Sequence, residues 1–215
     1  MQMVSADEVR ELFDQHIAFG DEAVRRAVQT PGGEELTVET NQAEYVVRVR
    51  PKFLRLGSEP WIRTLVVAER TDRPPAGAPE TFVVAVQRDG QALPLYKKPV
   101  VATLGKRLHD GLDPVAYGEV LARYHPWTSA WVDVITVPRQ LTREFGGTDL
   151  PAPPLPLLTA SGEALRLTFH SREIHRTGSG GSRVLSIRSW EVRSWRDRPA
   201  SWSSELVVRD ALLDP

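Results

Sequence analysis

One residue with the potential to act in catalysis is a carboxylate inside an apolar run. Asp133 lies between Trp131 and Val137, on the same alternation as Trp131 and Ile135. A buried carboxyl group has a raised pKa and can act as an acid or a base. With His125 or His170 as partner, Asp133 would suit a small-molecule enzyme or ligand carrier with a pocket inside a curved sheet. A solvent-side position or a salt bridge to an arginine explains the same aspartate, and we favour that interpretation.

The other residue types that support catalysis or cofactor binding are sparse. The chain has no cysteine, which excludes disulfides, thiolate metal sites and cysteine nucleophiles. His170 and His175 are five residues apart, so on a regular strand they point to opposite faces and cannot share a metal ion. The sequence also lacks a phosphate-binding glycine loop, a dinucleotide fingerprint and a nucleophile elbow. We therefore expect no metal and no cofactor, and we lean towards a protein that is not an enzyme.

The charges of this nearly neutral chain are unevenly distributed. Residues 1–44 carry three basic and ten acidic side chains, residues 45–73 carry seven and three, and residues 164–198 carry eight and three. Clustered positive charge can attract an anionic partner even when the net charge is close to zero. The candidate partner-binding residues are Arg48, Arg50, Lys52, Arg188, Trp190, Arg193, Trp195 and Arg196.

Tryptophan interleaves with arginine in the second basic region. Arginine beside an aromatic ring can grip single-stranded nucleic acid, with guanidinium on phosphate and the indole ring against a base. The same pattern also arises when tryptophans of a half-buried hairpin stack under arginine stems of their own sheet, which is the more common structural reason. Strand parity places Trp190 with Arg188 and Arg196 on one face, and Trp195 with Arg193 on the other.

Helices are expected at three places. Ser5 and Glu8 form a capping box, and Val9, Leu12, Phe13 and Ile17 repeat at helical spacing behind it. A second short helix is predicted over 23–28. Asp113 and Pro114 begin a third helix that runs to about Arg123.

Strands are predicted from residue 36 onwards, where the hydrophobic period changes to alternation. The predicted strands cover 45–53, 62–69, 81–87, 131–137, 164–175, 183–195 and 206–209. Those at 62–69 and 81–87 are apolar on both faces and should be central. Asp89-Gly90 suits a hairpin turn, and residues 177–182 form a glycine-rich hairpin tip.

These elements predict an α+β fold, a mostly antiparallel sheet that is curved or partly closed, with the N-terminal helix and the helix near 115–123 packed on it. We expect a single domain over 1–215, with a possible minor boundary at the proline-rich segment 151–156. No apolar stretch is long enough to span a bilayer and the start lacks a secretory signal, so a cytoplasmic location without membrane contact is predicted.

The leading functional hypothesis is a non-catalytic binding module whose basic, aromatic sheet face meets nucleic acid or an acidic protein surface. The pocket enzyme using Asp133 is the first alternative. The second is a structural subunit that assembles through its tryptophan-rich hairpin arm. The sequence leaves the oligomeric state open.

Overall fold

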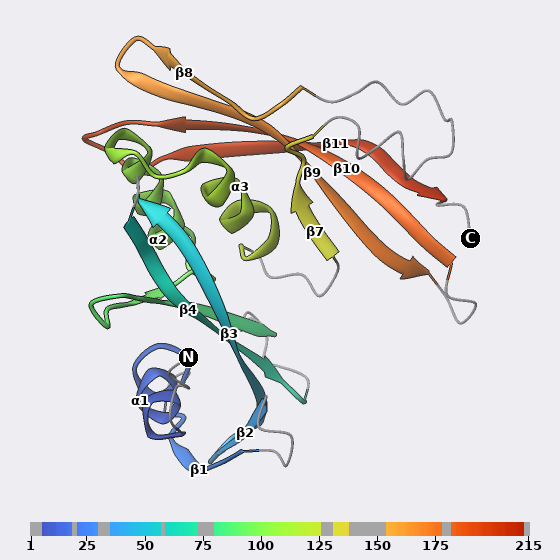
Figure 1. Ribbon diagram of the computed structural model, residues 1–215. Helices are drawn as coiled ribbons and strands as arrows, with labels where there is room; N and C mark the ends of the chain where they lie inside the picture. The colour runs from blue at the N-terminus through green and yellow to red at the C-terminus, as the bar shows by residue number, and fades with distance from the viewer. Residues whose placement is uncertain are drawn as a thin grey trace. The chain divides into compact units, whose positions relative to one another are not determined.

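The computed structural model describes residues 6–18, 21–29, 35–56, 59–72, 80–125, 131–137, 154–177 and 182–212. The chain divides into two compact units, Met1–Val100 and Val101–Pro215. The division does not coincide with the proline-rich segment, of which residues 154–156 are described and lie outside any helix or strand. The expectation of a single domain stays a prediction. Figure 1 shows the elements of both units.

The first unit is an antiparallel meander with one helix against it. Its strands are β1 (Val24–Gln29), β2 (Glu35–Thr40), β3 (Glu44–Leu56), β4 (Glu59–Arg70), β5 (Thr81–Gln87) and β6 (Ala92–Pro94), and they are neighbours in chain order. β4 and β5 are central strands, and their residues Leu65–Ala68 and Phe82–Val86 are buried on both faces, as their unbroken apolar runs predict. The register of β3 shifts after Pro51, a residue that has no N–H to give to a ladder.

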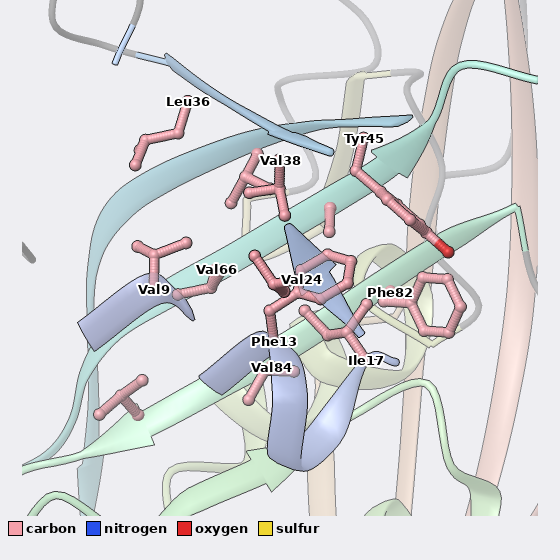
Figure 2. Packing of buried hydrophobic residues seen from close by; sticks show 13 residues of the cluster. Val9, Phe13, Ile17, Val24, Leu36, Val38, Tyr45, Val66, Phe82 and Val84 are labelled. Carbon is pink, nitrogen blue, oxygen red and sulfur yellow. The ribbon is translucent and has the colours of Figure 1, made fainter. Parts of the chain in front are cut away.

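The helix of this unit, α1 (Ala6–His16), packs through the predicted stripe. Val9, Phe13 and Ile17 are buried against strand residues, and Leu12 is partly buried beside them. The Phe13 and Tyr45 rings meet edge to face with their centroids 4.7 Å apart. Figure 2 shows this cluster, in which α1 supplies one side and the strands supply the other. Ser5 of the predicted capping box lies outside the described residues.

The helix predicted over 23–28 is wrong, because residues 24–28 lie in β1. β1 pairs antiparallel with β2, so the ladder satisfies the backbone groups that a helix would have paired internally. The Asn41 side chain fixes the entry to β1 by accepting from Ala23 N at 2.8 Å and donating to Asp21 O at 3.0 Å. Tertiary pairing therefore overrides a weak local helical preference.

The second unit combines a second antiparallel sheet with helical segments. Its strands are β7 (Trp131–Val134), β8 (Leu157–Ser161), β9 (Ala164–Thr177), β10 (Ser182–Ser194) and β11 (Ser201–Leu212). Their order is β11, β10, β9, β7, and β8 pairs with the other half of the same β9 edge as β7. The long strands β9, β10 and β11 run together in orange to red in Figure 1.

Three helical segments precede this sheet in the chain: α2 (Lys98–Leu104), the 3-10 helix η1 (Gly105–Asp110) and α3 (Pro114–Arg123). The predicted cap of α3 is confirmed, since the Asp113 carboxylate accepts from Val115 N at 3.0 Å and Pro114 begins the helix. A methyl group on Gly118 of α3 would lie 3.2 Å from both Phe169 and Val134, so α3 packs closely on the face of the sheet that these residues share.

The predicted α+β class with mostly antiparallel strands and packed helices is therefore confirmed. The strands form two sheets instead of one, and neither sheet closes on itself. The strand predicted over 131–137 ends at Val134, and the short strand predicted over 206–209 is part of the much longer β11. The hairpin predicted at Asp89-Gly90 is present, with Gly90 at a φ of 90°.

Candidate anion-binding surface

Arg48, a candidate of the first basic region, is bound within its own sheet. Its Nε donates to Glu35 Oε1 at 2.6 Å, and its Nη1 donates to Glu69. The hydrogen bond to Glu69 has the largest effect and that to Glu35 the next, and both raise the pKa of Arg48. Two carboxylates therefore contact this one guanidinium. The side chains of Arg50 and Lys52 lie outside the described residues.

Trp190 lies inside the second unit, on the face of the sheet that α3 covers. Its side chain is 8% exposed, and its ring stacks on Phe169 with centroids 5.6 Å apart. The indole N–H donates to Ser171 Oγ at 2.9 Å, which satisfies the one polar atom of the ring. Arg188 is half-buried on the same strand parity and reaches Ser204 Oγ at 3.4 Å. Trp190 is therefore a core residue of this unit.

The remaining candidates, Arg193, Trp195 and Arg196, lie where β10 ends and the chain turns towards β11. We call the basic side chains at this end of the second sheet the basic cluster; they come from η1, β9, β10 and the turn, and those of Arg166 and Arg193 point to the face of the sheet opposite the one that α3 covers. Its members are Lys106, Arg107, Arg166, Arg193, Arg196 and Arg198. Arg166 joins the cluster because it is directly opposite Arg193 in the register of β9 and β10.

Hydrogen bonds hold the turn against α2 and η1. Ser194 is fully buried, and its hydroxyl donates to Gly105 O at 2.8 Å, while a ring nitrogen of His109 lies 3.2 Å from Ser194 O. Ala200 N donates to Ala102 O at 2.9 Å, and Lys106 Nζ donates to Asp197 O at 3.3 Å. These contacts place the basic residues of η1 next to those of the turn.

Two acidic residues near the basic cluster, Glu191 and Asp110, are shared between arginines, and a third, Asp197, lies in the turn itself. Glu191 accepts from Arg166 at 2.8 Å and from Arg193 at 3.1 Å, and these bonds, Arg166 first, hold the pKa of the Glu191 carboxyl below its ordinary value. Asp110 lies 3.4 Å from Arg107 and 4.0 Å from Arg196. One carboxylate cannot neutralise two guanidinium groups, so an excess of positive charge remains at each site.

The arginines of this surface are open to solvent. The side chain of Arg193 is 62% exposed and that of Arg196 is 73% exposed. Trp195 is half-buried, and the Arg198 guanidinium carbon lies 4.1 Å from the centroid of its ring. The surface therefore combines exposed hydrogen-bond donors with an aromatic ring that already carries an arginine, the combination that suits phosphate or carboxylate recognition.

Asp133 and His170 lie on one face of the second sheet and His125 lies on the other, so the three candidate catalytic residues do not meet at one place. Asp133 accepts from Arg172 Nη2 at 3.2 Å and from the Trp131 indole, so it takes part in the salt bridge that we favoured from the sequence. His170 lies on the same face of β9 as Arg172, and burial lowers its pKa. His125 follows α3 in the chain. Its ring lies edge to face against the Trp202 ring, with the centroids 5.8 Å apart, on the face of the sheet that α3 covers. Asp133 is therefore bound by a cation and separated from His125 by the sheet.

Metal ligands are not clustered in the described part of the chain. No group of three or more histidine and acidic side chains in these residues could hold an ion. β9 pairs with β10 without a register shift from Leu165 to Thr177. His170 and His175 therefore point to opposite faces, as predicted. Among the described residues, no helix is long and apolar enough to cross a membrane.

Comparison with known proteins adds no functional information. No protein-family model matches the chain, and neither the curated proteins nor the solved structures contain a significant match.

Sequence reasoning did not single out Lys106, Arg107 or Arg166. Arg198 is one of the arginines that interleave with tryptophan in the sequence, three residues from Trp195, although it is not among the predicted partner-binding residues. Arg166 requires the register of β9 against β10, and the residues of η1 require the packing of that helix on the turn.

Proposed function

We propose that the second unit is a non-catalytic binding module whose basic cluster holds an anionic partner, either nucleic acid or an acidic protein surface. The observation that carries the proposal is the sharing of Glu191 and Asp110 between pairs of exposed arginines. Each pair keeps unused N–H donors and a net positive charge at the surface. An anionic group can take up these donors without breaking a neutral ion pair.

The two basic regions make unequal contributions to this proposal. Arg48 is neutralised by two glutamates, whereas the arginines around Glu191 and Asp110 outnumber their acids. The proposal therefore rests on residues of the second unit, with Trp195 and Arg198 as the aromatic and cationic pair beside them. Stacking of a base on the Trp195 ring would favour nucleic acid over an acidic protein.

The test is binding of two fluorescent probes, a single-stranded oligothymidylate and polyglutamate, measured by anisotropy at several salt concentrations. The variant is Arg193→Glu with Arg196→Glu, and we expect its affinity to fall at least about tenfold for the probe that binds, because several charged contacts are lost or reversed. The matched control is Arg25→Glu with Arg26→Glu, which makes the same change in net charge on exposed positions of β1. We expect the control to bind within about twofold of the unmodified protein.

Either of two results would refute the proposal: binding of neither probe at low salt, or equal weakening by the two double variants. A third variant, Trp195→Ala, distinguishes the partners. Loss of a stacked base costs about 1–3 kcal/mol, so this variant should weaken the oligonucleotide and spare polyglutamate. Equal effects on both probes would favour the acidic protein surface.

A further inference from the structure

A row of exposed side chains crosses the second sheet on the face opposite the one that α3 covers. Arg166 of β9 is opposite Thr159 of β8 on one side and opposite Arg193 of β10 on the other. Arg193 is in turn opposite Ser201 of β11. Residues that are directly opposite one another share a face of the sheet and lie about 5 Å apart. The row therefore has two neighbouring arginines at its centre and a hydroxyl group at each end, and all four residues are exposed.

Glu191 lies next to this row and bridges its two arginines. It is two residues before Arg193 on β10, so it shares the face of the row. Its Oε2 accepts from Arg166 Nη2 at 2.8 Å, and its Oε1 accepts from Arg193 Nε at 3.1 Å. Within the described part of the chain, neither arginine side chain has another ion-pair or hydrogen-bonding partner. Among those residues, Glu191 is therefore the only anion bound to the pair.

We propose that a phosphate group of a single-stranded nucleic acid binds between Arg166 and Arg193, and that Glu191 sets the affinity of this site by competing with the phosphate for the two guanidinium groups. The inference rests on the proposed function and commits it to one partner. A phosphate group presents several acceptor oxygens, which suit two guanidinium groups and the hydroxyl groups at the ends of the row. Trp195, two residues after Arg193, offers an aromatic ring for a base.

The competition follows from the charges at this site. The hydrogen bonds from Arg166, which has the larger effect, and from Arg193 hold the pKa of the Glu191 carboxyl below its ordinary value, so this side chain is ionised at neutral pH. A phosphodiester also carries one negative charge. Its binding therefore either displaces the carboxylate from the arginines or places two anions side by side. Both alternatives weaken binding, and neither arises when the side chain at position 191 is neutral.

The test is Glu191→Gln, measured by fluorescence anisotropy with a single-stranded oligothymidylate at low salt. Glutamine keeps the size of the side chain and removes its charge. We expect binding to become about threefold tighter or more, because two exposed ion pairs no longer compete with the ligand. The matched control is Glu205→Gln, which makes the same change in net charge at an exposed position of β11 on the same face, opposite Ser189. The control should change the affinity by less than about twofold.

A second background tests whether the effect depends on the arginine pair. With Arg166→Gln and Arg193→Gln already present, Glu191→Gln should strengthen binding no more than Glu205→Gln does. Unchanged or weaker binding by Glu191→Gln alone, a gain no larger than that of the control, or a gain that persists without the two arginines would each overturn this inference and leave the proposed function standing. A gain confined to polyglutamate would reject phosphate as the ligand. Binding of neither probe, by the unmodified protein or by Glu191→Gln, would refute the inference and the proposed function together.

Discussion

The replacement Gly105→Ala tests the contact that positions the basic cluster. A Cβ atom at residue 105 would lie 2.4 Å from Ala200 Cβ and 2.7 Å from Tyr117 Oη, closer than such atoms approach in proteins. Ala200 Cβ cannot rotate away, so the backbone of η1 or of the turn must move. Overpacking of this kind costs about 1–3 kcal/mol. Movement also weakens the bond from Ser194 Oγ to Gly105 O, which contributes about 1 kcal/mol.

The expected loss of unfolding free energy is therefore about 2–4 kcal/mol, measured by urea denaturation followed by circular dichroism. Thr103→Ala, an exposed position two residues earlier and within α2, serves as the control and should stay within about 0.5 kcal/mol. Combining Gly105→Ala with Ala200→Gly removes the closest clash, so the double variant should be more stable than the sum of the single effects by at least about 1 kcal/mol. If Gly105→Ala unfolds like the unmodified protein, or if Ala200→Gly brings no recovery, the close approach of η1 to the turn is refuted.

Two further predictions concern the first unit. Phe13→Ala removes a fully buried ring and its edge-to-face contact with Tyr45, so it should lower the unfolding free energy by about 3–5 kcal/mol in the same urea assay, and an effect below about 1 kcal/mol would contradict the packing of α1. Burial, and next the charge of Lys97, lowers the pKa of His16, whose ordinary value is 6.5, so the folded state resists protonation while the unfolded state accepts it. The contribution of His16 to the free energy of unfolding should therefore be fully present above pH 6.5 and should be lost as the pH falls below it. His16→Gln should reduce the slope of stability against pH between pH 7.5 and 5.5. An unchanged slope would contradict the burial of the ring.

Much of the fold follows from local sequence signals. The Asp113 cap, the turn at Gly90 and the stripe of α1 are set by residues close together in the chain, so they are readable without tertiary information. The segment 23–28 shows where local sequence signals fail to predict the structure. Its backbone is satisfied by β2, and no local pattern announces that pairing. The assembly of the strands into two sheets is likewise decided by long-range pairing.

The site was predicted less completely, because exposure and neutralisation depend on register. Trp190 looks like Trp195 in sequence, yet strand parity places Trp190 under α3 and next to Phe169. Arg48 looks like Arg193, yet the neighbours of Arg48 in β2 and β4 are glutamates that both reach it. Composition identifies the regions that are basic. Only the pairing of the strands shows which arginines have more acidic neighbours and which have fewer.

Counting charges along the chain therefore misjudges a surface in both directions. Residues 45–73 have a clear excess of basic side chains, but Arg48 contacts two acids and Arg70 contacts another. Around the end of β10 the reverse holds, since Glu191 and Asp110 each serve two arginines. On the proposed function, the N–H donors that these exposed arginines do not use in their ion pairs are the ones that a phosphate or carboxylate would bind.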